Sequence, residues 1–271
     1  MNRKILPYIA LVVVIVGLLI YADASSPKPV DWSPTYATKD KIPFGLYVLD
    51  QEAPQLFKGD SIQKFRTTPY EFFDGLYDYD NEQYKTSGTY IAINEESDID
   101  SESVTELLNF ADYGNTVMLS MKYFPQTITD TLGLVMGNQF FSDSIAINLA
   151  KTPAKKYWLN EGAGVMYFDS ISPERVTAGG IKILGYQYIK GKKYPDFVEV
   201  PFGNGRILLH TQPAAFTNYY LLKKDHYNYI QGLVSAIPKG TIFWQNGTAG
   251  DGVSGSPLRY IFSQPALKAA Y

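Results

Sequence analysis

The chain has no cysteine among its 271 residues and only two histidines, His210 and His226. The lack of cysteine excludes disulfides, Cys-ligated zinc, iron–sulfur clusters, thiol catalysis and a lipidated N-terminal cysteine. Neither histidine begins an H-x-x-x-H or H-x-x-E pattern, so no transition-metal site is predicted. We therefore expect neither a metal nor a cofactor.

Basic residues are not concentrated anywhere in the chain. No block of five basic residues occurs, and the formal net charge is −3 at pH 7. Nucleic acid is therefore not expected as a partner. Hydrophobic residues make up 45% of the chain and charged residues 19%. This composition excludes a disordered or fibrous protein and allows one large domain or two small ones.

A charge-free apolar run from Ile5 to Ala22 stands near the N-terminus. As a helix it would be about 27 Å long, which matches the hydrocarbon core of a bilayer. Arg3 and Lys4 precede the run and Asp23 follows it, so the N-terminus is expected in the cytoplasm and the rest outside. We predict a transmembrane anchor over residues 1–24. The alternatives are a signal peptide cleaved after Ala24 and a buried core helix.

The rest of the chain divides into three parts. Residues 25–43 are rich in proline and predict an extended linker. Residues 44–244 alternate strand and helix patterns and predict the folded domain. Residues 245–271 begin as a glycine-rich exit segment.

The strongest structural pattern covers residues 89–121. Thr89–Ile93 and Thr116–Met121 are apolar and predict buried strands, with a helix between them that begins at Ser103. Glu106 would complete a capping box with Ser103, and Gly114 would end the helix. A crossover of this length predicts that the two strands are parallel neighbours.

Other segments extend the α/β pattern. The turn residues Gly203-Asn204-Gly205 predict a hairpin between two strands. A final helix is predicted over Asp225–Ala236. The remaining strands are predicted at Phe44–Leu49, Ser144–Leu149, Gly164–Phe168, Ile181–Ile189, Phe197–Val200 and Thr241–Trp244.

Two stretches carry a resemblance to a known family. Asp31–Tyr36 with Asp40–Gly45, and later Gly203–Asn218, resemble domain of unknown function 4350, which is known from bacterial envelope proteins, notably of the Bacteroidetes type. The resemblance implies a glutamine-amidotransferase-like (flavodoxin-like) fold: a mostly parallel sheet flanked by helices, with added antiparallel strands. Family members commonly have two transmembrane helices, and their genes often neighbour those of MoxR-type AAA+ ATPases and von Willebrand-factor-like proteins.

The resemblance also bears on catalysis. Class I amidotransferases use a cysteine on a tight turn after a strand and a His-x-Glu pair after a later strand. Ser120 stands where such a nucleophile would be sought, but no G-x-S-x-G elbow surrounds it. His210 follows a late strand, yet Gln212 replaces the carboxylate and cannot hold an imidazolium as an acid does. We predict that amidotransferase chemistry is absent.

Two further groups of residues suggest binding sites. Ser120, His210, Gln212 and Asn218 would line a pocket at the strand ends, where open α/β sheets bind ligands. The alternative is a histidine that is simply hydrogen-bonded at a strand terminus. An acidic loop would offer oxygen ligands to a cation, or would instead lead into a helix N-terminus. Its candidate ligands are Glu95, Glu96, Asp98 and Asp100.

Aspartates interleaved with aromatic residues stand between residues 70 and 80. Asp74, Asp78 and Asp80 lie among tyrosines and phenylalanines. One interpretation is a glycan-binding site, with aromatic stacking and carboxylates; the alternative is a tyrosine-rich loop packed on the domain. We favour the packed loop.

Taken together, these features predict a domain in the inner membrane that faces the periplasm. We expect a non-catalytic component that binds a ligand or a protein partner of the envelope, in a system associated with a MoxR-type AAA+ ATPase. The alternative is an envelope hydrolase or transferase with an unrecognised serine or carboxylate site. Since family relatives continue into a second apolar span, we also expect one beyond Tyr271; the alternative is that 265–271 is a frayed terminal helix.

Overall fold

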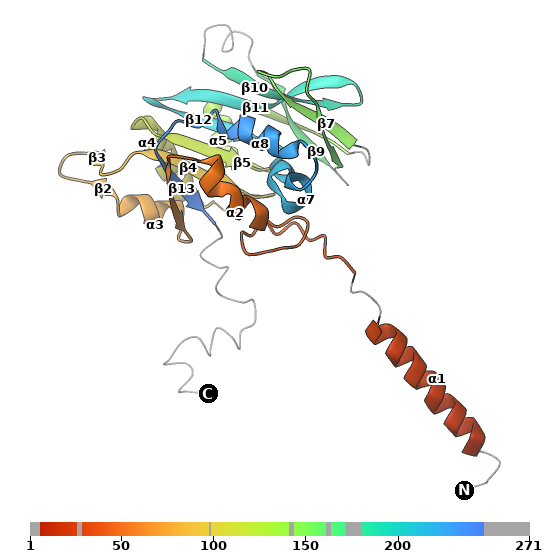
Figure 1. Ribbon diagram of the computed structural model, residues 1–271. Helices are drawn as coiled ribbons and strands as arrows, with labels where there is room; N and C mark the ends of the chain where they lie inside the picture. The colour runs from red at the N-terminus through yellow and green to blue at the C-terminus, as the bar shows by residue number, and fades with distance from the viewer. Residues whose placement is uncertain are drawn as a thin grey trace, which may run out of the picture. The chain divides into compact units, whose positions relative to one another are not determined.

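The computed structural model describes residues 6–25, 29–97, 99–140, 144–160, 164–171 and 180–246. The chain forms two compact units, Met1–Trp32 and Ser33–Tyr271. The first contains helix α1, Leu6–Ser25 (Figure 1). In the part of the chain that is described, no helix has the length and hydropathy of a membrane span. The predicted anchor therefore stays a prediction, and the predicted end of the chain from residue 247 lies outside the described residues.

A mixed sheet of nine described strands forms the centre of the second unit (Figure 1). The pairs from β1 through β13, β4 and β5 to β12 are parallel, and the pairs from β12 onward are antiparallel. The fold is therefore α/β with a parallel core and added antiparallel strands. In spatial order the strands are β1 (Ser61–Phe65), β13 (Thr241–Gln245), β4 (Gly88–Ile93), β5 (Thr116–Ser120), β12 (Gly205–His210), β11 (Lys192–Phe202), β10 (Lys182–Ile189), β7 (Ser144–Leu149) and β8 (Tyr157–Asn160).

The predicted strand–helix–strand unit is confirmed. Strands β4 and β5 are parallel neighbours, with Thr89 opposite Thr116, and helix α4 (Ser101–Asp112) connects them. The helix begins two residues earlier than predicted because Asp100 caps it: the Asp100 carboxylate accepts hydrogen bonds from Ser103 N at 2.8 Å and from Ser103 Oγ at 2.9 Å. Ser103 is thus inside the first turn, and Gly114 follows the helix with φ +93° as expected.

The predicted strand Phe44–Leu49 was wrong, since helix α2 covers Tyr47–Leu56. Leu46, Leu49, Ala53 and Leu56 are buried at spacings of three and four residues, which is the period of a helix and not of a strand. The apolar run that resembled a buried strand is instead the inner face of this helix. A short run of this kind does not distinguish the two structures by periodicity alone.

The other predicted strands and the final helix are confirmed. The hairpin joins β11 and β12 with Phe202 opposite Gly205, and Gly203 has φ +54°. Helix α8 covers His226–Val234. Nine described elements had no prediction: the edge strands β1 and β8 of the main sheet, and α3 (Pro69–Asp74), β2 (Tyr77–Asp78), β3 (Gln83–Tyr84), α5 (Gln126–Leu132), β6 (Val135–Gln139), η1 (Pro213–Phe216) and α7 (Asn218–Leu221). Strand β6 pairs with the predicted β9 (Val165–Ser170) outside the main sheet.

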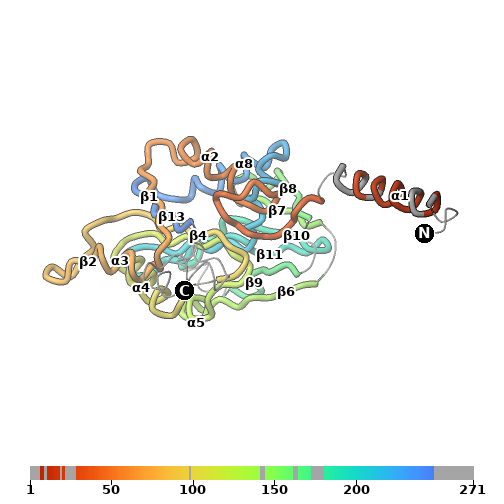
Figure 2. Tube along the Cα trace, turned by 90° about the horizontal axis from the view of Figure 1, so that it is seen from below, coloured from red at the N-terminus to blue at the C-terminus, as the bar shows by residue number. Residues whose placement is uncertain are grey.

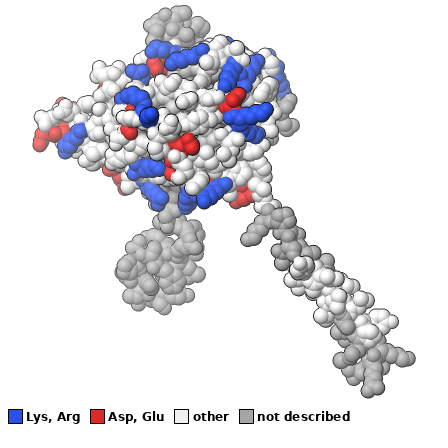
Figure 3. Space-filling view, viewed as in Figure 1, with Lys and Arg blue, Asp and Glu red and all other residues white. Residues whose placement is uncertain are grey.

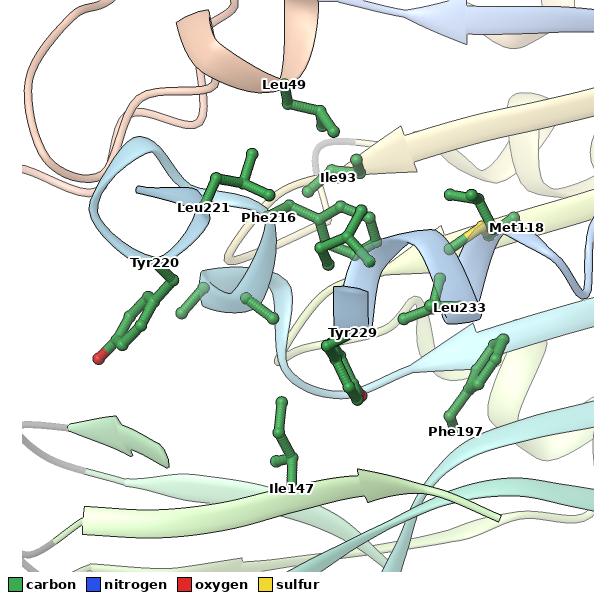
Figure 4. Close-up of a cluster of buried hydrophobic side chains, with 14 of the residues drawn as sticks. Leu49, Ile93, Met118, Ile147, Phe197, Phe216, Tyr220, Leu221, Tyr229 and Leu233 are labelled. Atoms are coloured by element: carbon green, nitrogen blue, oxygen red, sulfur yellow. The ribbon is translucent and has the colours of Figure 1, made fainter. Parts of the chain in front are cut away.

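Helices cover both faces of the sheet. Figures 1 and 2 show α2, α7 and α8 on one face and α3, α4 and α5 on the other. Because strand side chains alternate between faces, each face has its own hydrophobic core. Met118 and Ile93 belong to the first core, which is shown in Figure 4, while Leu119 and Ala92 belong to the second. Because β1, β13, β4, β5 and β12 run in the same direction, their carboxyl ends lie together at one edge of the sheet.

Candidate functional site

Ser120 and His210 end the adjacent parallel strands β5 and β12 and lie directly opposite each other. Ser120 Oγ is 2.8 Å from His210 Nδ1, and His210 Nε2 is 3.0 Å from the Tyr229 hydroxyl of α8. All three residues are buried, Ser120 and His210 completely. Burial lowers the pKa of His210 to about 3, so its ring is neutral at physiological pH, with one nitrogen donating and the other accepting. The result is a hydrogen-bonded chain that joins two strands to a helix.

Gln212 belongs to a second buried network. Its Nε2 donates to Gln187 Oε1 at 2.6 Å and to the Met166 carbonyl at 3.3 Å, while Gln187 Nε2 donates to the same carbonyl at 2.7 Å. The amide therefore holds strand β10 and strand β9 to the end of β12. This interaction differs from that of a catalytic carboxylate, which would accept a hydrogen bond from the histidine.

Asp196 is a fully buried carboxyl at an irregular position of β11, next to the bulge that β10 makes around Gly185. No described side chain hydrogen-bonds to either of its oxygens, and only the backbone amides of Asp196 and Phe197 favour its charged form. A Cβ at Gly185 would lie 2.7 Å from Asp196 Oδ1, so glycine is needed there to leave room for the carboxyl. Burial raises the pKa of Asp196 well above its ordinary value. Burial and, secondarily, Asp196 raise the pKa of the Tyr229 hydroxyl.

Asn218 holds the segment that leads into the domain. Its Nδ2 donates to the carbonyls of Asp40 at 2.9 Å and Ile42 at 2.7 Å, and its Oδ1 accepts from Val48 N at 2.7 Å. Asn218 N also donates to the Gly45 carbonyl. The side chain thus satisfies three backbone groups of a turn and is not a pocket residue with free polar atoms.

The residues that follow β5 are engaged in the structure itself. Lys122 Nζ lies 3.1 Å from Glu95 Oε1, and the amides of Lys122 and Tyr123 both donate to the Glu95 carbonyl. The two residues that follow Ser120 are therefore a buried methionine, Met121, and an ion-paired lysine, Lys122.

The acidic loop separates into different roles. Glu95 pairs with Lys122, Glu96 forms an isolated bridge with Tyr123, and Asp100 caps α4. Asp98 lies outside the described residues. Among the residues that are described, no group of three or more histidines and acids is placed to hold a metal ion. For Asp100, the helix N-terminus is the interpretation that the hydrogen bonds support.

The tyrosine-rich segment around residues 70–84 packs on α4, which agrees with the predicted packed loop. Tyr84 donates to Glu106 at 2.6 Å, and its ring makes edge contacts with Phe73 and Phe110. The Tyr79 hydroxyl donates to Asp74, and Asp78 accepts hydrogen bonds from the turn residues that follow it. These aspartates therefore serve local structure.

A cavity of about 90 Å³ lies at the carboxyl ends of β4, β5 and β13. Its walls come from Asn94 and Met121 after the central strands, from residues 244–246, and from residues 35–38 of the leading segment. None of the described residues that line it carries a charged side chain. Its polar and aromatic lining consists of Thr35, Tyr36, Thr38, Asn94, Trp244, Gln245 and Asn246.

The predicted strand-end pocket is thus only partly assembled. The structure brings Ser120 and His210 into contact, but it places Gln212 and Asn218 in separate networks, and none of the four lines the cavity. Sequence reasoning missed Tyr229, Asp196 and Gln187. The one available signal was Asp196 itself, a charged residue directly before the apolar strand Phe197–Val200.

The comparison with protein families decides the assignment. The family model described as "Domain of unknown function (DUF4350)" matches residues 38–234, well over half of the chain. The chain belongs to the DUF4350 family. No curated protein matches the DUF4350 chain.

Solved structures show weak likenesses to the DUF4350 chain. A ThuA-like protein from Bacteroides uniformis has a TM-score of 0.41 and 11% identity over 66% of this chain and 91% of its own. Gan42B, a GH42 β-galactosidase from G. stearothermophilus, has a TM-score of 0.35 and 12% identity over 58% of this chain and 22% of its own. An exo-β-1,4-mannosidase from an Opitutaceae bacterium has a TM-score of 0.36 and 10% identity over 54% of this chain and 26% of its own. The DUF4350 chain thus spans about a quarter of the length of these two glycosidases or less.

Proposed function

We propose that this DUF4350 chain is a non-catalytic binding domain, tethered to the inner membrane and facing the periplasm. The observation that carries the proposal is the complete burial of Ser120 and His210, the serine and histidine that hydrogen-bond to each other. A nucleophile must reach its substrate, and its base must be able to take up a proton. Here the serine is enclosed, and burial lowers the pKa of the histidine to about 3.

The strand-end edge has the features of a binding site without those of a reaction site. Among the described residues, the cavity there is lined by hydroxyl, amide, aromatic and aliphatic side chains and by no carboxylate, imidazole or cationic side chain. General acid–base and nucleophilic catalysis both need a titratable group within hydrogen-bond reach of the reacting atoms. The lining offers hydrogen bonds and shape alone.

The sequence of the N-terminal segment supports the membrane tether. The run Ile5–Ala22 carries no charged residue, and the side chains of Leu11, Val12 and Ile20 are more than half exposed in the described structure. A helix that is apolar on all sides is stable when it is surrounded by lipid or by protein. The preceding Arg3 and Lys4 favour a cytoplasmic N-terminus.

The resemblance to the family supports the finer parts of the proposal: an amidotransferase-like (flavodoxin-like) fold and a protein partner in an envelope system that contains a MoxR-type AAA+ ATPase. The charge distribution agrees with a protein or neutral ligand. Figure 3 shows lysine and arginine side chains scattered around the rim of one face, with acidic side chains among them and a largely uncharged centre. A polyanion would favour a continuous basic stripe.

The experiment is an activity test of the full chain purified in detergent. We expect no ammonia release from glutamine and no labelling by a fluorophosphonate, a reagent that modifies activated serines. The control is Ser103→Ala, which removes a buried serine on a different element, in the first turn of α4. Labelling that Ser120→Ala abolishes and Ser103→Ala leaves intact would establish the alternative, a hydrolase that uses Ser120. Steady ammonia release that His210→Ala abolishes would establish a glutaminase.

A further inference from the structure

We propose that the cavity at the carboxyl ends of β4, β5 and β13 binds the hydroxyl-rich, uncharged end of a small polyol or saccharide. This inference names the ligand class of the proposed binding domain and rests on that function. It starts from the chemistry of the lining, because a site selects its ligand through the groups that the ligand must satisfy.

The absence of charge in the described lining excludes ionic ligands as preferred occupants. An anion or cation that entered the cavity would lose hydration without gaining a counter-charge, which is unfavourable. The ion pair of Lys122 and Glu95, on the two loops that follow β5 and β4, is satisfied within the protein. Glutamine, with its charged amino and carboxylate groups, is therefore a poor fit. An uncharged polyol has no charged group to desolvate.

The lining also matches hydroxyl groups in its hydrogen-bonding capacity. Thr38, Asn94 and Asn246 line the cavity and are half-buried, and their side chains make no hydrogen bond to any described residue. Hydroxyl and amide groups both donate and accept, as do the hydroxyls of a polyol. Tyr36 and Trp244 add aromatic surface, which suits the C–H side of such a ligand.

The size of the cavity limits how much of the ligand it encloses. A cavity of about 150 Å³ holds a benzene molecule. At about 90 Å³, this one holds a smaller group, such as glycerol or the edge of a terminal sugar unit. A longer saccharide would extend out of the opening.

Residues 35–38 form the outer wall of the cavity, and backbone hydrogen bonds hold them in place. Tyr36 is buried and has φ +47°, a left-handed conformation that is unfavourable for a non-glycine residue. It is held by hydrogen bonds from Tyr36 N to the Phe44 carbonyl and from Leu46 N to the Ala37 carbonyl. Backbone conformations of this kind cluster at ligand sites, where the surrounding contacts hold them. The turn presents Thr35 and Thr38 to the cavity.

The test uses tryptophan fluorescence of the full chain in detergent. The chain has three tryptophans, and the double variant Trp32→Phe/Trp158→Phe leaves Trp244, at the cavity, as the only one. Glycerol and maltose are titrated as uncharged probes, and glutamine and glucuronate as charged ones. Asn94→Ala in the same background removes one lining amide. Asn109→Ala, an exposed amide on α4, is the matched control.

We expect saturable emission changes with an uncharged probe, with affinity reduced about tenfold by Asn94→Ala and unchanged by Asn109→Ala. A tenfold loss corresponds to about 1.4 kcal/mol, the upper range for one hydrogen bond. Maltose binding tighter than glycerol would identify a saccharide end, and the reverse a free polyol. The proposal is overturned by saturation with the charged probes alone, by binding that Asn94→Ala leaves intact, or by no saturation. Since no turnover is measured, these outcomes are independent of the activity test above.

Discussion

Asp196 is held in surroundings that oppose its charge, and this has a consequence for stability. Its oxygens have no side-chain hydrogen-bond partner among the described residues, and burial raises its pKa well above the ordinary value of 3.8, against the opposing effect of the backbone amides of Asp196 and Phe197. Above that pH the folded protein therefore binds more protons at this carboxyl than the unfolded chain does. By linkage, the contribution of Asp196 to stability is fully present below the unfolded pKa and is lost as the pH rises through the folded pKa.

We predict that Asp196→Asn becomes progressively more stable than the parent protein as the pH rises above the ordinary aspartate pKa of 3.8. The measurement is the free energy of unfolding in denaturant at a series of pH values. His210 acts in the opposite direction, because burial lowers its pKa from 6.5 to about 3 and it destabilises the fold as the pH falls through that window. The effect of His210 is the same in both proteins, so it cancels when the free energies of unfolding of Asp196→Asn and the parent are subtracted. A difference that does not change with pH would contradict the prediction.

The contact between Ser120 and His210 illustrates the limit of the sequence at this scale. The apolar run Thr116–Met121 predicted the first strand, which ends one residue earlier, at Ser120, and the hairpin turn Gly203-Asn204-Gly205 predicted the strand that ends at His210. That the two side chains touch depends on the register of β5 against β12, 90 residues apart. No local pattern contains a register between distant parallel strands, and the same holds for Tyr229 and for the pairing of Gln212 with Gln187.

Helix α4 was predictable in its middle because its buried residues repeat with helical period. Leu107 is completely enclosed between the helix and the sheet, while Leu108, one position on, is half-buried. We predict that Leu107→Ala lowers the free energy of unfolding by about 2–5 kcal/mol, because it leaves a cavity in the second core. Leu108→Ala should cost clearly less. Equal losses, measured by denaturant unfolding, would show that the cavity is not the cause.

The turn ahead of α2 depends on one side chain from the other end of the domain. Asn218→Ala would leave the carbonyls of Asp40 and Ile42 and the amide of Val48 without their partner. We predict a loss of about 1–3 kcal/mol or more and faster proteolytic cleavage between residues 33 and 46. Asn218→Asp keeps the acceptor and loses the donors, so intermediate cleavage is expected. Cleavage at the parent rate in Asn218→Ala would refute this role.

The elements that the sequence misplaced share a physical cause. The apolar run at residues 44–49 is compatible with a strand or with the start of a helix. The chain forms helix α2 from Tyr47 because this conformation packs Leu46 and Leu49 on the first core. The start of α4 was misplaced because Asp100 and Ser103, three residues apart, are both good N-caps, and the Asp100 carboxylate accepts hydrogen bonds from Ser103. Tertiary contacts decided both cases.

At the scale of the whole molecule, the membrane topology is open to a direct test. We predict that alkaline phosphatase fused after Pro257 is active, since that enzyme folds only outside the cytoplasm. A cytoplasmic fluorescent reporter at the same position should be dark. Arg3→Glu with Lys4→Glu removes the charge asymmetry and should reduce the phosphatase signal. A dark phosphatase fusion with a bright cytoplasmic reporter would reject the proposed orientation.

The place of β13 in the sheet sets the order in which the domain is made. Strand β1 pairs with β13 alone among the described strands, and β13 also separates β1 from β4. Strand β1 can therefore pair only after residues 241–245 have been synthesised. This pairing closes the long loop between residues 65 and 241, which is slow. During synthesis, β4 keeps an unpaired apolar edge until the far end of the domain has emerged, which exposes the chain to aggregation. A nascent chain that stops short of Thr241 would need a chaperone to remain soluble, whereas one that reaches Gln245 can complete its own sheet.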